Sequence, residues 1–210
     1  GPPGTSPLTL SDDAAKQIQG RKHIEAGIRS TDAHDEDGVV IQSNYLDLAM
    51  LMDYWSPLRL NHHTESTTML YGARECARVV LQEGLEAGFL RHKLASRALR
   101  AGLTAMGLKL FGDPDHRMDN VTGVFVPPSV RDESSVRKSM LEDFGIEIGT
   151  SFGPLQGKIW RIGTMGYVCR KANVLRCLSS LENVLRRQGF SINTGSGVDA
   201  AYEVYDGKTP

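Results

Sequence analysis

The sequence is short of cysteine, of long apolar runs and of net charge of either sign. Its three cysteines have no Cys-x-x-Cys spacing, which argues against a disulfide framework and against a zinc site. The longest stretches without a charged residue, such as residues 120–130, are 11 residues long, whereas a membrane-spanning helix needs about 20 apolar residues. With 24 Lys plus Arg against 25 Asp plus Glu, the net charge is -1, so no basic field favours nucleic acid or an anionic membrane.

Familiar catalytic motifs are also scarce. No Ser/His/Asp nucleophile grouping, glycine-rich phosphate loop or paired-carboxylate motif stands out. Cys169 and Cys177 are expected to be core thiols or inert surface ones. Unpaired cysteines favour the reducing cytoplasm as the location.

The start of the chain is unusual. It opens with a Gly-Pro-Pro-Gly turn and has neither an initiator Met nor a signal peptide. Such a turn normally lies inside a chain. We therefore expect further residues upstream of Gly1.

Hydrophobic periodicity predicts a mainly helical first half. Ser11 is placed to cap one helix, and Trp55-Ser56-Pro57 stops another. The domain boundary is expected along two consecutive helices, between which Gly84 and Gly88 interrupt the helical pattern. The predicted elements are a strand at residues 8–10 and helices at residues 11–20, 44–54 and, as the consecutive pair, about 65–106.

Beyond residue 107 the pattern changes to that of a small α+β domain. Residues 191–210 are rich in glycine and weakly patterned, and we expect this tail to be mobile or to lie over a neighbouring element. The predicted elements are strands at residues 108–111, 121–126, 146–148 and 158–162, and helices at residues 131–144 and 171–188.

Two segments invite a metal-binding interpretation. The acidic segment 34–38 lacks the ligand spacing and the closing Glu of a calcium loop, so a solvated loop is favoured. His62 and His63 are adjacent, and their side chains diverge too far to serve one metal simply. No metal site is expected.

A phosphate site is one interpretation of the polar string at residues 59–64. This string leads directly into a predicted helix, and Thr64 or Ser66 can serve as its N-cap. A hydroxyl and backbone N–H groups at the positive end of a helix suit a phosphate. A plain helix cap remains the alternative.

Arg161 is the second candidate ligand-binding residue. Alternation along a strand places Ile159, Arg161 and Gly163 on one face, and Trp160 and Ile162 on the other. The planar guanidinium suits a carboxylate, and the small Gly163 leaves room for a ligand. The alternative is an Arg at a strand edge in a structural ion pair.

Five short strings occur in an order that resembles the class V aminotransferases. The resemblance covers nearly all of residues 1–189. Within the class, the chain is similar to the alanine-glyoxylate, serine-pyruvate and ureidoglycine-glyoxylate aminotransferases. The strings are residues 1–6 (GPPGTS), 62–64 (HHT), 70–75 (LYGARE), 145–148 (GIEI) and 160–163 (WRIG).

The resemblance implies the α/β architecture of fold-type I pyridoxal phosphate enzymes, of which this chain would be the C-terminal part. In that family the lysine that forms the Schiff base with pyridoxal 5'-phosphate (PLP) lies just upstream of the Gly-Pro-Pro-Gly turn. No lysine of this chain stands at that position, so the chain alone is expected to be inert. The implied parts are the end of the large PLP-binding domain (1–63), connecting helices (64–106), a small α+β domain (107–190) and a tail (191–210).

The resemblance also assigns site residues and partners. Thr64 matches the threonine that contacts the PLP phosphate in the active site of the other subunit of a homodimer. Arg161 matches the arginine that binds the substrate carboxylate, and Ser151 lies in a segment, residues 149–151, that borders the substrate. Asn61 stands where alanine-glyoxylate members usually carry Tyr, and its amide can pair with a ureido group.

The implied activity is PLP-dependent transamination with glyoxylate as amino acceptor. The amide of Asn61 favours ureidoglycine as the amino donor, with oxalurate and glycine as products of purine breakdown. The alternatives are an alanine-glyoxylate or serine-pyruvate aminotransferase, or a non-catalytic fragment if no lysine precedes Gly1.

Overall fold

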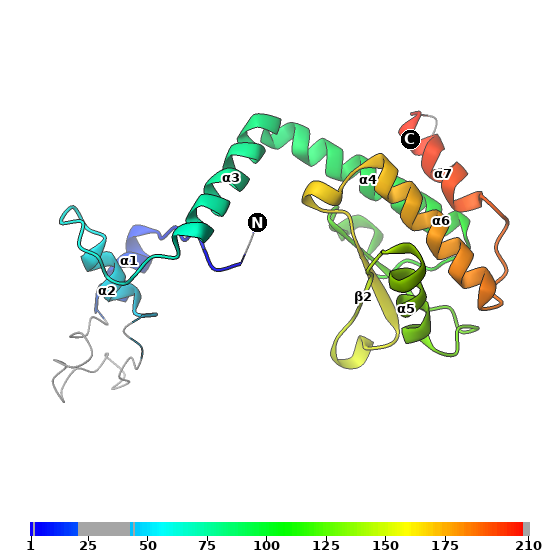
Figure 1. The fold of residues 1–210 in the computed structure, drawn as a ribbon, viewed down its shortest axis with the longest axis horizontal. Helices are drawn as coiled ribbons and strands as arrows, with labels where there is room; N and C mark the ends of the chain where they lie inside the picture. Colours follow the sequence, from blue (N-terminus) through cyan, green and yellow to red (C-terminus); the bar gives the residue numbers. More distant parts are fainter. Residues whose placement is uncertain (2, 21–42, 44, 208–210) are drawn as a thin grey trace. The chain divides into compact units, whose positions relative to one another are not determined.

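The computed structural model describes residues 1, 3–20, 43 and 45–207 (Figure 1). These residues form two compact units, Gly1–Val79 and Val80–Pro210. Within the described ranges, no helix is both long enough and apolar enough to cross a membrane.

The first unit contains two short helices that polar side chains cap. Helix α1 (Asp12–Gly20) begins after Ser11, whose hydroxyl accepts a hydrogen bond from a first-turn N–H, as predicted. Helix α2 (Leu48–Tyr54) begins after Asp47, whose buried carboxylate accepts from two backbone N–H groups. The strand predicted at residues 8–10 is wrong, because these residues have no strand partner in the described structure and are exposed.

Two long consecutive helices follow, as predicted. Helix α3 (Thr67–Glu83) and helix α4 (Leu85–Ala105) are separated by Gly84, which has a φ of 84°. A left-handed backbone of this kind favours glycine and ends α3. The carbonyl oxygen of Ser66 accepts hydrogen bonds from the N–H groups of Met69 and Leu70 in the first turn of α3, so Ser66, and not Thr64, lies at the helix boundary.

The second unit contains a three-stranded antiparallel sheet. Its strands are β1 (Val121–Phe125), β2 (Gly149–Thr150) and β3 (Ile159–Gly163). The order is β1-β3-β2, so β3 is the middle strand. The predictions for β1 and β3 are confirmed to within one residue at each end.

The other two predicted strands are not formed as expected. Residues 146–148 are irregular, and pairing with β3 begins only at Gly149. Residues 108–111 contribute a single bridge, between Leu110 and Val124 of β1. Apolar alternation predicted both strands, but alternation does not by itself supply a neighbouring backbone to pair with.

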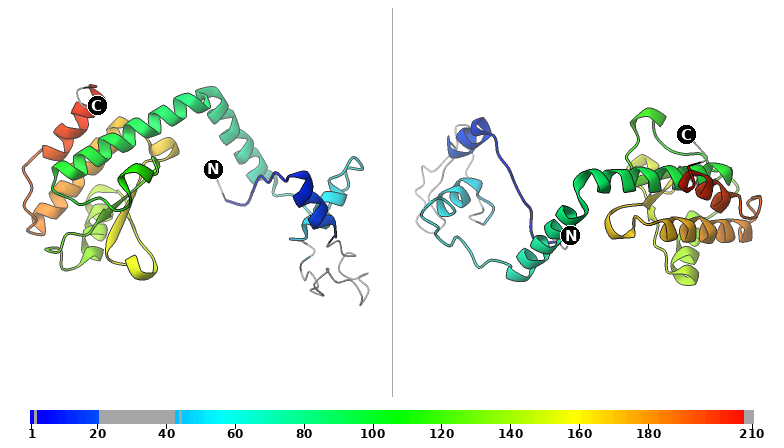
Figure 2. Two further views of the ribbon diagram at one scale, coloured as in Figure 1. Left: turned by 180° about the vertical axis from the view of Figure 1, so that it is seen from behind. Right: turned by 90° about the horizontal axis from the view of Figure 1, so that it is seen from above.

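Three further helices complete the second unit. Helix α5 (Glu133–Phe144) and helix α6 (Lys171–Arg187) were predicted. Helix α7 (Ser196–Tyr205) lies in the predicted tail and packs on α4 and α6 (Figures 1 and 2). Of the two expectations for the tail, lying over a neighbouring element is therefore correct for α7. Short 3-10 turns occur at Pro114–His116, Gly153–Leu155 and Gly166–Val168.

The core of the second unit lies between its helices and one face of the sheet. Leucines of α4 and α6 meet Trp160 and Ile162 of β3 in one cluster of buried side chains. The indole Nε1 of Trp160 donates a hydrogen bond to the Glu133 carboxylate at 3.0 Å. Because alternate residues of β3 enter this core, its remaining residues lie on the opposite face.

Candidate functional site

Arg161 lies in the centre of the sheet, on the face opposite the core. Its neighbours Trp160 and Ile162 are 0% and 3% exposed in the core, while Arg161 is half-buried. The predicted alternation is therefore confirmed for residues 160–162, whereas Gly163, which was expected to leave room for the ligand, does not line the hollow beside Arg161. The alternative of an Arg on an edge strand is wrong, because β3 is flanked by β1 and β2.

A glycine stands on each side of Arg161 across the sheet. Gly123 of β1 and Gly149 of β2 are its directly paired residues. Directly opposite residues of an antiparallel pair point to the same face, so any other residue type would place a side chain beside the guanidinium. A Cβ on Gly149 would lie 3.5 Å from Nη2 of Arg161. Gly149 leaves that space open, whereas the corresponding position at Gly123 is filled by Phe111, whose Cβ would lie 3.1 Å from a Cβ on Gly123.

Two contacts hold the guanidinium of Arg161 in place. Its Nε donates a hydrogen bond to the carbonyl of Thr150 at 2.7 Å. Its Cζ lies 4.5 Å from the centre of the Phe152 ring, which suits a cation–π contact. Within the part of the chain that the structure describes, the two Nη atoms form no hydrogen bond and no carboxylate pairs with this Arg. An oriented guanidinium with two available Nη atoms suits a bidentate carboxylate.

The side chain of Arg161 lines a hollow of about 300 Å³ on this face of the sheet. Ser151, 9% exposed, lines the same hollow, so the structure brings these two predicted residues together. Cationic side chains contribute to the wall and favour an anionic ligand. The polar or charged lining residues are Arg100, His116, Arg117, Thr122, Ser151 and Arg161.

Asn61 and Thr64 lie in the first unit, on the segment that leads into α3. Both side chains are exposed, whereas His62 and His63 between them are partly buried. In the described structure Thr64 has no hydrogen-bond partner for its hydroxyl. The predicted site residues thus form two pairs in two different units.

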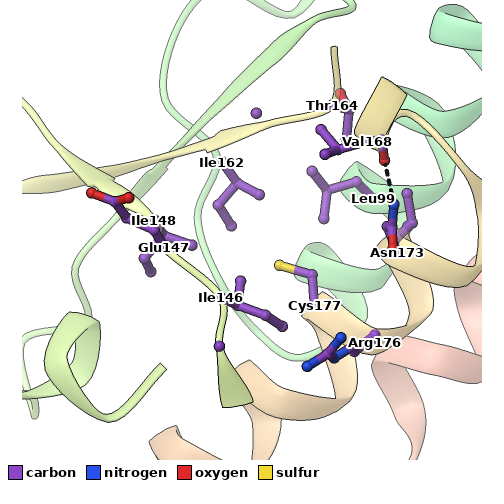
Figure 3. Close-up of a pocket in the computed structure, with 13 residues that line it drawn as sticks. Leu99, Ile146, Glu147, Ile148, Ile162, Thr164, Val168, Asn173, Arg176 and Cys177 are labelled. Carbon is purple, nitrogen blue, oxygen red and sulfur yellow. Dashed lines mark hydrogen bonds between the residues drawn. The ribbon is translucent and has the colours of Figure 1, made fainter. Parts of the chain in front are cut away.

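A second hollow, of about 250 Å³, lies between α6, the end of β3 and residues 145–148 (Figure 3). The sulfur of Cys177 points into the space beside Leu99, Ile146 and Ile162 (Figure 3). Burial raises the pKa of this thiol to about 12, so it stays protonated at neutral pH and is a poor nucleophile. Burial also raises the pKa of Cys169, and the predicted inertness of both thiols agrees with these surroundings.

Two segments of the sequence invited a metal interpretation, residues 34–38 and residues 62–63. Among the described residues, no three His, Cys, Asp or Glu side chains gather in a way that would hold a metal ion. The acidic segment 34–38 lies outside the described residues. His62 and His63 contact each other through their Nδ1 atoms.

Two contributors to the Arg161 site, Gly123 and Phe152, were not predicted from the sequence. Gly123 lies 38 positions before Arg161, and only the strand register places it beside Arg161. Phe152 directly follows the segment 149–151 that was expected to border the substrate, but its ring contact with the guanidinium was not expected.

The chain is similar to several curated proteins over nearly its whole length. It is 52% identical over 207 residues to the (S)-ureidoglycine--glyoxylate transaminase of Bacillus subtilis, covering 98% of this chain and 50% of that protein. It is 35% identical to the alanine--glyoxylate aminotransferase of Callithrix jacchus, covering 88% of this chain and 42% of that protein. The chain belongs to the class V aminotransferases. No family model matches it.

Solved aminotransferase structures agree with this assignment. The ureidoglycine-glyoxylate aminotransferase of Bacillus subtilis matches with a TM-score of 0.75 and 57% identity, over 79% of this chain and 42% of that one. The pyridoxamine-pyruvate aminotransferase of Mesorhizobium loti matches with a TM-score of 0.70 and 30% identity, over 75% of this chain and 40% of that one. The fold is therefore a mixed α/β part of a fold-type I aminotransferase, as predicted. The chain spans about half the length of the curated relatives it matches.

Proposed function

We propose that this chain forms part of a PLP-dependent aminotransferase that takes ureidoglycine as amino donor and glyoxylate as amino acceptor. The observation that carries the proposal is the similarity to the Bacillus subtilis transaminase over almost the whole chain. The free thiols of the described cysteines accord with a cytoplasmic enzyme.

Arg161 would bind the carboxylate that both substrates share. Its two Nη atoms are available, its orientation is set by Thr150 and Phe152, and Gly149 leaves room beside it for the ligand. One guanidinium can therefore hold the donor and the acceptor in turn, in the same orientation. Ser151, on the wall of the same hollow, would border the bound substrate.

The exposed hydroxyl of Thr64 fits the phosphate of PLP. It has no partner among the described residues, and a hydroxyl donates readily to a phosphate oxygen. When bound, PLP supplies the electron sink for proton removal at the substrate α-carbon. Thr64 would hold the phosphate in the active site of a second subunit of a homodimer, as the family resemblance implies.

Asn61 would select the donor. Asn61 lies three residues before Thr64, and its side chain is exposed. The side chain carries both a carbonyl acceptor and an NH₂ donor. A ureido group offers the complementary donor and acceptor, whereas the methyl group of alanine offers neither. A site built for such hydrogen bonds discriminates strongly against an analogue that lacks them.

A chimeric enzyme tests the proposal. In it, this chain replaces the matching half of the Bacillus subtilis transaminase, and binding of PLP by absorbance confirms assembly. We expect faster reaction of glyoxylate with (S)-ureidoglycine than with alanine, and we expect Asn61→Tyr to shift that preference towards alanine. A chimera that binds PLP and prefers alanine before any substitution would refute the proposed donor.

Substitution of Arg161 in the same chimera tests the carboxylate contact. Arg161→Lys keeps the charge and loses the planar fork, so kcat/KM should fall on the order of 10²-fold with either substrate. Arg137→Lys is the matched control, because Arg137 pairs with Glu133 and does not line the hollow. Equal kcat/KM values for the Arg161 variant and the unsubstituted chimera would remove the assigned role.

A further inference from the structure

Four side chains that line the Arg161 hollow can carry a positive charge. They are Arg100, His116, Arg117 and Arg161. Arg100 pairs with the carboxylate of Asp119 at 3.4 Å, and Nδ1 of His116 lies 2.9 Å from the carboxylate of Asp113. The other two arginines form no ion pair within the part of the chain that the structure describes. Two guanidinium groups without a carboxylate partner therefore line the same hollow.

Arg117 is partly buried and is held at one of its three nitrogens. Its Nη2 donates a hydrogen bond to the carbonyl of Gly112 at 3.2 Å. Its Nε is buried and has no partner among the described residues. A buried donor without an acceptor is costly, and the cost is larger when the donor belongs to a charged group. The Nε–H of Arg117 therefore needs an acceptor that its described neighbours do not supply.

The carboxylate of Asp113, four residues before Arg117, is already engaged elsewhere. One oxygen accepts a hydrogen bond from the N–H of Asp115 at 3.0 Å, and the other lies 2.9 Å from Nδ1 of His116. These two contacts, more than the charge of Arg117, lower the pKa of the Asp113 carboxyl. Asp113 thus caps its own turn and leaves the Nε–H of Arg117 unpaired.

Apolar side chains form much of the remaining wall of the hollow. They come from the sheet and from the loops beside it, and they are Phe111, Met118, Val121, Leu155 and Ile159. A volume of about 300 Å³ is at the lower end of the range for small-molecule sites. The guanidinium is planar and pairs well with a carboxylate. Two unpaired guanidinium groups in an apolar hollow therefore suit a short hydrocarbon chain with a carboxylate at each end.

We propose that the Arg161 hollow binds short aliphatic dicarboxylates, with one carboxylate on Arg161 and the other on Arg117. Neither ureidoglycine nor glyoxylate carries a second carboxylate, so this ligand class goes beyond the proposed function. The contact at Arg161 rests on the proposed function, whereas the contact at Arg117 rests on its unpaired Nε–H. A bound dicarboxylate would occupy the place of the substrate carboxylate and compete with both substrates.

Nuclear magnetic resonance of the full 210-residue chain tests this binding through the Nε–H signals of Arg117 and Arg161. Titrations with succinate and glutarate are compared with titrations with butyrate and pentanoate, which have the same number of carbon atoms and one carboxylate. Ionic strength is held constant, because it alters the screening of charges. We expect at least one dicarboxylate to bind about 10-fold more tightly than its monocarboxylate and to shift the Nε–H signal of Arg117.

Substitutions at Arg117 test its charge. Arg117→Gln keeps a side-chain NH₂ group and loses the charge, so the preference for the dicarboxylate should disappear. Arg117→Lys keeps the charge on a different head group, so part of the preference should remain. Arg161→Lys should weaken the binding of both kinds of ligand, because both use that arginine. The matched control is Arg186→Gln, which removes one positive charge from an exposed position of α6 outside the hollow and should leave the preference unchanged.

Equal affinities for dicarboxylates and monocarboxylates in the parent chain would overturn the proposal, and so would an undiminished preference in Arg117→Gln. A Lys variant with no more preference than the Gln variant would contradict the role of the charge. If monocarboxylates shift the Arg161 signal and dicarboxylates bind no more tightly, only this inference fails and the proposed function stands. If no carboxylate shifts the Arg161 signal, the carboxylate contact of the proposed function fails as well.

Discussion

At the scale of single residues, the Arg161 site depends on what its neighbours lack. A guanidinium in the middle of a sheet usually competes with side chains on both adjacent strands for space. Here both paired positions are glycine, and the nearest polar contact is a backbone carbonyl that engages Nε alone. The Nη edge is thereby kept for a ligand while the side chain remains oriented.

The two glycines beside Arg161 should respond differently to an added methyl group. A Cβ on Gly149 would make ordinary contacts, 3.5 Å from Nη2 of Arg161, whereas a Cβ on Gly123 would lie 3.1 Å from Cβ of Phe111. We expect Gly123→Ala to lower the free energy of unfolding by about 1–3 kcal/mol through overpacking. Gly149→Ala should change it by less than about 1 kcal/mol. Urea denaturation of both variants measures the difference, and the reverse order would contradict the strand register.

Cysteine reactivity offers a test based on pKa. Burial raises the pKa of Cys177 from 9.0 to about 12, so below that range the folded protein keeps this thiol protonated. We expect iodoacetamide at mildly alkaline pH to modify the partly exposed Cys76 well before Cys177. Mass spectrometry of the digested protein measures both rates. In urea the rates should converge, and equal rates in the folded protein would contradict the burial of Cys177.

The candidate site could be predicted from the sequence only in part, for a physical reason. The face of Arg161 follows from local alternation, because side chains along a strand alternate whatever the strand pairs with. Gly123 and Gly149 belong to other strands, and the register that places them beside Arg161 is set by tertiary packing. The His62–His63 bond was missed because divergent side-chain directions were expected for adjacent residues.

At the scale of elements, α4 and α7 approach so closely that only glycine fits between them. A Cβ on Gly102 of α4 would lie 2.6 Å from the carbonyl oxygen of Gly197 in α7 and 2.5 Å from Leu178 of α6. Because the Gly197 carbonyl is part of the backbone of α7, it can move away from a new Cβ only if α7 itself moves. The docking of α7 therefore depends on two small residues far apart in the sequence.

Two glycine substitutions in α4 test this packing. Gly102→Ala should lower the free energy of unfolding by about 1–3 kcal/mol or more, because α7 must shift to admit the methyl group. Gly88→Ala is the control in the same helix, where the nearest atom to a new Cβ is a flexible Glu83 oxygen at 3.6 Å. It should raise stability by roughly 0.5–1 kcal/mol through helix propensity. Denaturant unfolding of both variants checks the prediction, and destabilisation by Gly88→Ala alone would reject it.

The helices were better predicted than the strands, because helical periodicity is local and long. Helices α3 to α6 agree with their predicted ranges to within about two residues. Helix α7 was missed because its ten residues are preceded by a glycine-rich segment and begin after Gly195. Its Ala201 and Val204 become a buried face only against α4 and α6, which is tertiary information.

At the scale of the whole molecule, the buried apolar residues are distributed unevenly. Among the described residues, the main hydrophobic cluster belongs to the second unit, from Ala95 to Val204. The buried apolar side chains of the first unit are Ala49 and Met50. Since apolar burial is the principal stabilising contribution, the second unit should be the more stable one.

The chain should therefore unfold in two separable steps. Native-state hydrogen exchange should be fast in α1 and α2 and slow in α4 and α6, because local stability follows buried contacts. A fragment of residues 80–210 should keep the denaturation midpoint of the second step, since it retains the whole hydrophobic cluster. Circular dichroism of the fragment and of the full chain in urea compares the two midpoints. A fragment that fails to unfold cooperatively would show that the second unit draws stability from the first, and the Arg161 hollow would then depend on residues in both.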